Sequence, residues 1–260
     1  MRAGVSALPD ADVDAPATLT DSAKVVVWGL VFWAGEQLAA AALERNATAM
    51  VAVQAGVAEW GAGRMAIAWS DPRADAPTWQ AVGRRAAAGA ALGAGCAAAV
   101  VLVAIAFRAA GVAAGEPALG ALLVGLLVAG LGAVRDELLL RGVVLRATRM
   151  LPVGATLAVC GLAAAAARFG VDGGVTPALI PEALRGAALG ALWVRDRGAW
   201  MPCAANAAWT WTMGPVFGGN LLDVRFGSEA ASVASAAAVL SVALAAAGWW
   251  IAGMPARRAS

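Results

Sequence analysis

The residues best suited to chemistry are two adjacent acids and an arginine, Asp136, Glu137 and Arg141, which follow a long apolar run. In a helix, Glu137 and Arg141 are four residues apart and share a face, so their side chains can form an ion pair. Asp136 then points about 100° away around the helix axis, toward other groups. Charges beside a membrane are costly without partners. These residues therefore either form a site or anchor a helix end at the membrane interface.

Two further segments place polar groups where lipid or packed helices should be. Arg168 ends the run Gly161–Arg168, and Asn206 and Thr210 lie in the segment that begins at Trp200. An asparagine amide can donate a hydrogen bond to an oxyanion. An arginine cannot act as a general base, because its guanidinium stays protonated. The chain contains no histidine.

The elements that position these residues follow from the composition. The 260 residues are 61% hydrophobic and 14% charged, with a mean hydropathy of +0.74. A soluble domain cannot bury that much apolar surface. The apolar runs have the length of membrane-spanning helices, and no alternating pattern indicates a barrel. We therefore predict an all-α fold, a polytopic membrane bundle of six to eight transmembrane helices.

Six strong spans and two weaker ones make up this prediction. The strong spans are Ala86–Phe107, Ala118–Val134, Pro152–Ala167, Ala178–Val194, Trp200–Val216 and Ala231–Ala252. Val25–Leu43 is weaker because Glu36 and Gln37 interrupt it. Ala47–Trp69 carries Gln54, Glu59 and Arg64, so it either crosses the bilayer or lies along the interface.

The chain is expected to form one unit with a peripheral N-terminal part. Residues 1–23 are polar, lack the features of a signal peptide and are predicted to be a mobile tail. Residues 24–85 hold the two weaker helices and the loop Asp71–Pro77, which carries two prolines and three charges. Residues 86–216 form the core, and residues 217–260 add a loop and a last transmembrane helix.

The basic residues alternate between successive loops. One side holds most of them: Arg84, Arg85, the cluster from Arg135 to Arg149, Arg195, Arg197, Arg257 and Arg258. The other side holds Arg108, Arg168 and Arg225. The positive-inside rule makes the first side cytoplasmic. We expect a multi-pass protein of the inner (cytoplasmic) membrane with a cytoplasmic C-terminus.

Several other features are interpreted as packing. Cys96, Cys160 and Cys203 lie in apolar stretches without paired spacing, which is typical of small buried side chains. The spacings Gly89-xxx-Gly93 and Gly186-xxx-Gly190 allow helices to approach closely. Trp193, Trp200, Trp209 and Trp211 are expected to be core or interface aromatics rather than a ligand cage. The net charge of +2 has no basic patch, which argues against nucleic-acid binding.

The order and spacing of the polar groups resemble the CPBP family of CAAX-protease and bacteriocin-processing intramembrane endopeptidases. That family carries E-E-x-x-x-R, then F-x-x-x-H, then H-x-x-x-N or D, each on its own membrane helix. The run Asp136–Arg141 is similar to the first motif, with Asp in place of the first Glu. The stretch Leu184–Pro202, with paired glycines and a Trp-x-Pro entry, is similar to the connection into the third motif. The resemblance covers about residues 86–216.

The later motifs depart from the family pattern. Aligning on the connector places Asn206 at the third-motif histidine and Thr210 at its Asn or Asp, and the second motif becomes Ala164-xxx-Arg168. In the family, the first carboxylate and a histidine activate water, and the later His and Asn stabilise the oxyanion. Losing members of such a set costs on the order of 10⁴–10⁶ in turnover. The resemblance therefore implies a degenerate homologue, in which the six motif positions are remnants of a catalytic site: Asp136, Glu137, Arg141, Arg168, Asn206 and Thr210.

Arg168 at a histidine position suggests a replacement for the lost chemistry. Its guanidinium is expected to pair with Asp136 or Glu137 and to turn a catalytic centre into a structural ion pair. Without histidine or a suitable cysteine group, we expect no zinc site and no other cofactor.

Three functions remain open. The first is a non-catalytic protein that acts by binding, as a scaffold, chaperone or accessory subunit of a membrane complex, with the lipid bilayer and another membrane protein as partners. The second is a working endopeptidase that cleaves membrane-anchored peptides, in which Asp136 or Glu137 activates water. The third is a transporter with Glu36, Glu59 and Glu182 as intramembrane carriers, although Arg185 lies one turn from Glu182 and is expected to pair with it.

Overall fold

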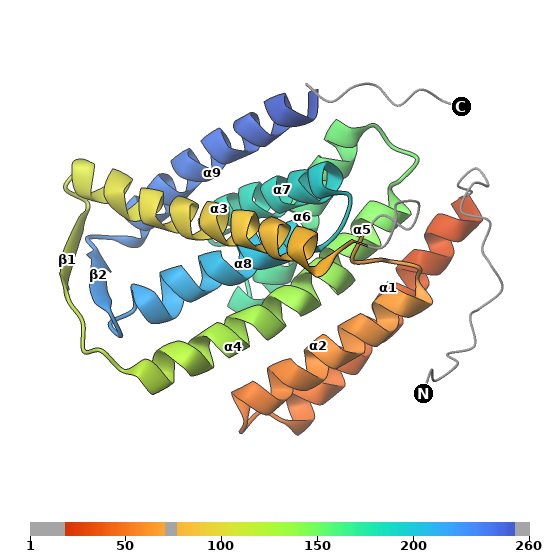
Figure 1. Ribbon diagram of the computed structural model, residues 1–260, viewed down its shortest axis with the longest axis horizontal. Helices are drawn as coiled ribbons and strands as arrows, with labels where there is room; N and C mark the ends of the chain where they lie inside the picture. Colours follow the sequence, from red (N-terminus) through yellow and green to blue (C-terminus); the bar gives the residue numbers. More distant parts are fainter. Residues whose placement is uncertain (1–18, 71–76, 253–260) are drawn as a thin grey trace.

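The computed structural model describes residues 19–70 and 77–252, and these form a helical bundle with both parallel and antiparallel neighbours (Figure 1). The helices before the site are α1 (Leu19–Ala42), α2 (Ala47–Arg64), α3 (Trp79–Ala106) and α4 (Leu119–Arg135). Those after it are α6 (Val153–Asp172), α7 (Leu179–Asp196), α8 (Trp200–Trp211) and α9 (Glu229–Ala252). The predicted all-α membrane bundle is confirmed.

The helix that carries the first motif changes its winding at the motif itself. The α-helix α4 ends at Arg135, the π-helix η1 runs over Asp136–Arg141, and the short α-helix α5 covers Gly142–Ala147. The three pieces continue as a single rod (Figure 1). The sequence predicts a regular α-helix over Asp136–Arg141, whereas the structure has a π-helical turn there. Such turns occur often at functional sites.

Five helical segments of the described residues are long and apolar enough to cross a bilayer. They are Leu19–Ala42, Trp79–Ala106, Leu119–Ala147, Val153–Asp172 and Glu229–Ile251. The first of these was a weaker candidate in the sequence. Two strong candidates do not meet the same standard. Helix α7 carries four charged residues, Glu182, Arg185, Arg195 and Asp196, and α8 has only 12 residues before the π-helix η2 (Thr212–Val216).

The N-terminal part is a helical hairpin against the bundle. Helix α1 begins at Leu19, so the tail predicted for residues 1–23 is wrong for its last five residues; residues 1–18 lie outside the described part. Helix α2 packs against α1 and α4 rather than standing apart from them. Helix α3 begins at Trp79, seven residues before the span predicted from residue 86. The predicted loop Asp71–Pro77 falls mostly on residues outside the description.

Glycines allow the closest helix contacts. A Cβ atom added to Gly89 or Gly93 of α3 would lie 2.1 or 2.0 Å from a backbone oxygen of α8. A Cβ added to Gly186 of α7 would lie 2.5 Å from the Ala164 Cβ on α6. Both glycine pairs therefore serve the packing predicted for them.

A two-stranded antiparallel sheet joins two connections at one end of the bundle. Strand β1 (Ala110–Ala114) follows α3, and strand β2 (Leu222–Phe226) precedes α9. Ala110 pairs with Phe226 and Ala114 with Leu222. This ribbon was not predicted, and it lies at the end opposite to α5 (Figure 1).

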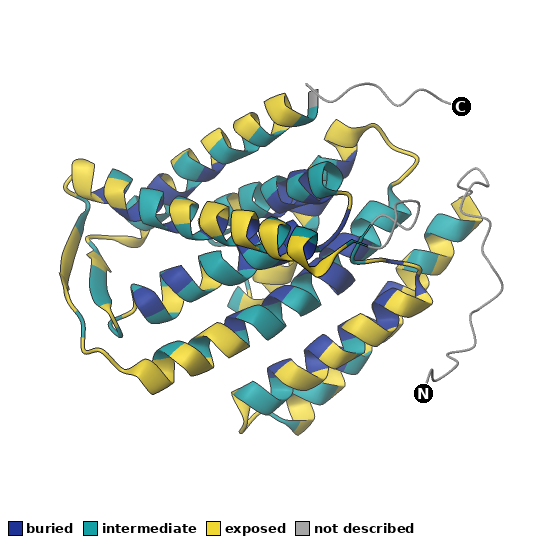
Figure 2. Ribbon diagram, in the orientation of Figure 1, coloured by how far each residue is buried: buried dark blue, intermediate teal, exposed yellow. Residues whose placement is uncertain are grey.

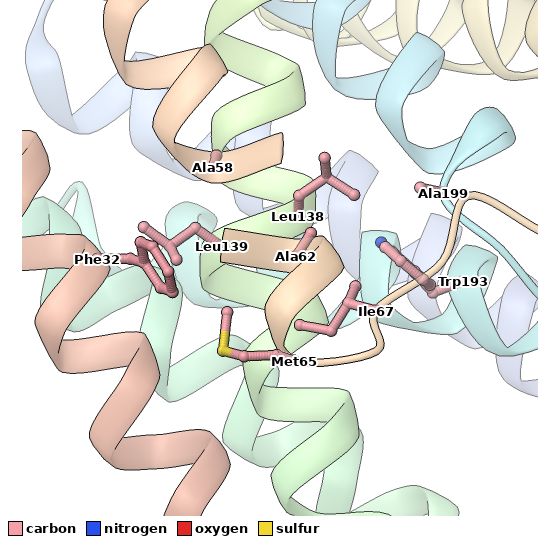
Figure 3. Packing of buried hydrophobic residues seen from close by; sticks show 9 residues of the cluster. All are labelled: Phe32, Ala58, Ala62, Met65, Ile67, Leu138, Leu139, Trp193 and Ala199. Atoms are coloured by element: carbon pink, nitrogen blue, oxygen red, sulfur yellow. The ribbon is translucent and has the colours of Figure 1, made fainter. Parts of the chain in front are cut away.

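A hydrophobic cluster surrounds the π-helical turn. Leu138 and Leu139 of η1 lie among residues of the N-terminal hairpin, including Phe32 and Ala62, and face Trp193 of α7 (Figure 3). Many large apolar side chains of α1, α4 and α9 are instead exposed, as expected for helices that face lipid (Figure 2). Four of the six residues of the motif turn are thus buried.

Candidate functional site

Glu137 and Arg141 form a buried ion pair at the centre of the bundle. The side chains are 0% and 1% exposed, and Arg141 Nη1 donates to Glu137 Oε1. The second carboxylate oxygen, Oε2, accepts a hydrogen bond of 2.9 Å from Trp193 Nε1. Both oxygens of Glu137 are therefore engaged. The i, i+4 pair expected from the sequence is present, and Trp193 is a core aromatic with a polar contact.

Asp136 points away from Glu137 and belongs to a second network. Its Oδ1 accepts from Arg135 Nε at 2.8 Å, and the neighbouring Arg135 Nη1 donates to Gln54 Oε1 of α2 at 3.3 Å. Gln54 Nε2 donates to the Glu36 carbonyl of α1 at 3.4 Å. The N-terminal hairpin thus contacts Arg135, which in turn forms the ion pair with Asp136.

The Asp136 carboxylate keeps one oxygen available. No described residue donates a hydrogen bond to its Oδ2, and the side chain is 26% exposed. Of the two motif acids, Asp136 is therefore the partly exposed one, and Glu137 is buried.

Arg168 does not pair with either motif carboxylate, so that hypothesis is wrong. Its Nε donates to Asp172 Oδ2 at 2.8 Å, and its side chain is 46% exposed. Helix α6 starts at Val153, so Arg168 lies near its far end, one turn before the left-handed Gly173 that terminates the helix. Thr210 of α8 is also exposed, away from the buried centre.

The cation that does reach the site is Arg185 of α7. Arg185 Nη1 donates to Oδ1 of Asn206, which is 1% exposed on α8. Arg185 also interacts electrostatically with Asp136 and Glu137. Sequence reasoning placed Arg185 only beside Glu182 and missed its second role. Its spacing of eight residues from Trp193 would have put the two side chains on one face of α7.

Glu182 balances the charge of Arg185. Arg185 Nε donates to Glu182 Oε2 at 2.9 Å, and Nη2 donates to Oε1. The pairing predicted for these two residues is confirmed. The guanidinium therefore has one carboxylate and one amide oxygen as partners.

Two cysteines also border the ion pair. Cys160 of α6 and Cys203 of α8 are buried free thiols that interact electrostatically with both Glu137 and Arg141. Cys160, not Arg168, is therefore the α6 side chain level with the motif acids. Within residues 19–70 and 77–252, no group of three or more histidine, cysteine or acidic side chains is arranged to hold a metal ion.

The three glutamates considered as carriers do not form a path. Glu182 is paired with Arg185, and the exposed Glu59 accepts a hydrogen bond of 2.9 Å from Trp69 Nε1. Glu36 is buried at 4% exposure, and its Oε1 has no hydrogen-bond partner within the described chain. Each glutamate has its own surroundings, and no chain of contacts connects them.

The arrangement offers little for proton transfer. A general base must reach the proton that it removes and be able to accept it. Glu137 has both oxygens occupied, Arg141 and Arg185 are cations, and Asn206 is neutral. What the site offers is one free amide donor on Asn206 and one accessible carboxylate oxygen on Asp136.

The family comparison agrees with the motif resemblance. Residues 117–212 match the family model described as "Type II CAAX prenyl endopeptidase Rce1-like". This match includes the Asp136–Arg141 turn and Asn206, so the CPBP resemblance stated from the motifs is confirmed for that segment. No curated protein and no solved structure shows a significant match to the chain.

Proposed function

We propose that the chain is a CPBP-type membrane protein without protease activity that acts by binding, as a scaffold, chaperone or accessory subunit of a membrane complex. One observation carries the proposal: the Glu137 carboxylate is fully enclosed, with one oxygen on Arg141 and the other on Trp193. A carboxylate in this state orients helices but does not activate water. The absence of histidine from the sequence supports the same function.

The proposed partner is another membrane protein, and the proposed location is the inner membrane with the C-terminus in the cytoplasm. The arginines at the ends of α4 and α7 and near the start of α3 support this location, as do Arg257 and Arg258 in the sequence after α9. The exposed apolar side chains of the membrane helices provide surface for lipid and for a partner.

Affinity purification from native membranes in a mild detergent tests the binding function. We expect a second membrane protein at a fixed stoichiometry, retained by the Asp136→Asn variant because no hydrolysis is needed. Purification of the wild-type chain as a lone monomer, in a preparation whose membranes were cross-linked before extraction, would contradict the proposal.

A second candidate is an endopeptidase, favoured by the accessible Oδ2 of Asp136. In this mechanism Asp136 accepts a proton from water and the Asn206 amide stabilises the oxyanion. Arg135 would have to keep its contact with Oδ1 while Oδ2 takes the proton.

Cleavage of membrane-anchored peptides by the reconstituted protein separates the two candidates. The endopeptidase requires hydrolysis that Asp136→Asn abolishes and that Arg168→Ala, a change at an exposed position outside the site, leaves unchanged. No cleavage above the Asp136→Asn background supports the binding function.

A further inference from the structure

A cavity of about 460 Å³ lies between α9 and the helices α3, α7 and α8. Figure 1 shows α9 lying beside this part of the bundle, away from α1 and α2. Its α9 wall consists of Leu240, three alanines (Ala243, Ala246 and Ala247) and then Trp249 and Trp250. Leu189 of α7 and Leu92 of α3 continue the apolar lining. Cavities of this size with a few polar groups are typical small-molecule sites.

The polar groups of the cavity are Arg185 and Asn206. Arg185 already has Glu182 as its counter-ion, and it also donates a hydrogen bond to Asn206 Oδ1. A carboxylate or phosphate would therefore add a second negative charge beside a guanidinium that Glu182 already balances. The charge balance favours a neutral ligand.

Asn206 nevertheless has an unused donor. Because Arg185 can only donate, its contact fixes the amide oxygen as the acceptor and leaves the Nδ2 group free. No described residue accepts a hydrogen bond from Nδ2, and Asn206 is part of the cavity lining. A donor facing an apolar cavity without an acceptor is costly. A ligand with an oxygen acceptor removes that cost.

We propose that the cavity binds a neutral membrane lipid with a single hydrocarbon chain and a carbonyl oxygen. The chain lies against the alanines of α9, and the carbonyl oxygen accepts a hydrogen bond from Asn206 Nδ2. The chain contributes the apolar burial, and the amide selects a carbonyl compound over a plain hydrocarbon.

Quenching of tryptophan fluorescence by two brominated probes tests this site, because Trp209, Trp249 and Trp250 line the cavity. The probes are a monoacylglycerol with a dibrominated chain and a dibrominated alkane of the same length, added to the full chain in nanodiscs. One hydrogen bond changes affinity by roughly threefold to tenfold. We expect saturable quenching by both probes, with the ester reaching half-saturation at a concentration lower by that factor.

Three variants identify the contacts. Asn206→Asp keeps an oxygen for Arg185 but removes the Nδ2 donor, and it should abolish the difference between the probes. Ala243→Phe fills the cavity and should remove saturable quenching by both, whereas Ala245→Phe on the exposed face of α9 should not. Equal half-saturation of the two probes in the wild-type chain, or full quenching of Ala243→Phe, would overturn the proposal. The Ala243 and Ala245 comparison holds even if Asn206→Asp fails to fold.

Discussion

The Glu137–Arg141 pair is enclosed on all sides, so its charges depend on each other. Removing one member of a buried pair leaves an uncompensated charge, which is far more costly than removing both. The Trp193 donor adds a third partner that belongs to another helix. The ion pair and the Trp193 hydrogen bond therefore connect η1 to α7.

A double-mutant cycle measures the dependence. We expect Glu137→Gln and Arg141→Met each to lower the free energy of unfolding by about 3–5 kcal/mol, because each leaves one buried charge alone. The double variant should lose clearly less than the sum. Chemical unfolding in mild detergent gives the free energy of unfolding of the two single variants and of the double variant. If the loss in the double variant equals the sum of the two single losses, the two charges do not depend on each other.

Glu36→Gln is the matched control for Glu137→Gln. Glu36 is also buried, but its Oε1 has no partner within the described residues. The same substitution there should leave the unfolding midpoint unchanged or raise it.

The Trp193 hydrogen bond can be separated from the packing of its ring. Trp193→Phe removes the donor to the Glu137 carboxylate and should cost about 1–3 kcal/mol. Trp211→Phe removes a comparable donor, which binds the neutral Leu122 carbonyl at 2.9 Å, so its loss should be smaller. Thermal unfolding of both variants in one detergent provides the comparison, and equal losses would contradict a special role for the carboxylate.

Motif spacing predicted the residues of the first motif but not the partner of its acids. Glu137 and Arg141 were placed correctly because four residues along a helix fix a shared face. Arg168 was misplaced because the spacing of a motif does not reveal how deep a helix sits, and α6 extends to Asp172. The contact of Arg185 with Asn206 was not predicted, because the ion pair with Glu182 already accounted for the charge of Arg185.

At the scale of the elements, the packing of α3 on α8 depends on Gly93. A Cβ there would lie 2.0 Å from the Ala205 carbonyl oxygen, whereas one on Gly95 of the same helix would meet nothing within 4 Å. Backbone atoms cannot move aside without separating the helices. These two glycines, two residues apart, should therefore respond oppositely to alanine.

We expect Gly93→Ala to lower the unfolding midpoint and Gly95→Ala to leave it unchanged or raise it, since alanine is favoured over glycine in a helix by about 1 kcal/mol. Thermal unfolding and gel-filtration profiles in detergent check both. A Gly93→Ala variant as stable as Gly95→Ala would contradict the close contact.

The helices themselves were predictable, and their irregularities were not. Runs of apolar residues identify membrane helices because the bilayer sets their length. The π-helical turn at Asp136–Arg141 has no such signal, since its residues also suit an α-helix. The strand Ala110–Ala114 is rich in alanine and glycine, and its pairing depends on a segment beyond five further helices.

At the scale of the whole molecule, the start of α3 and the β1–β2 ribbon lie at opposite ends of the bundle (Figure 1). Arg84 is exposed near the start of α3, and Arg225 is exposed on β2 beyond the other end of that helix. If the arginine-rich end is cytoplasmic, the two positions lie on opposite sides of the membrane.

Labelling of one introduced, exposed cysteine tests this orientation. In a Cys96→Ala background, a membrane-impermeant thiol reagent should label Arg225→Cys in spheroplasts and Arg84→Cys in inside-out vesicles. Cys160 and Cys203 are buried and should stay unlabelled in both. The reverse pattern would place the C-terminus outside the cytoplasm.

The β1–β2 ribbon has a consequence for biogenesis. Ala114 pairs with Leu222, so more than a hundred residues separate the paired strands along the chain. At 5–20 residues per second, synthesis of that interval takes on the order of ten seconds. During that time β1 has been synthesised but β2 has not, while α4, α6, α7 and α8 are made and inserted. The β1–β2 ribbon, which joins the α3–α4 and α8–α9 connections, therefore forms late, after the helices between its two strands have been made.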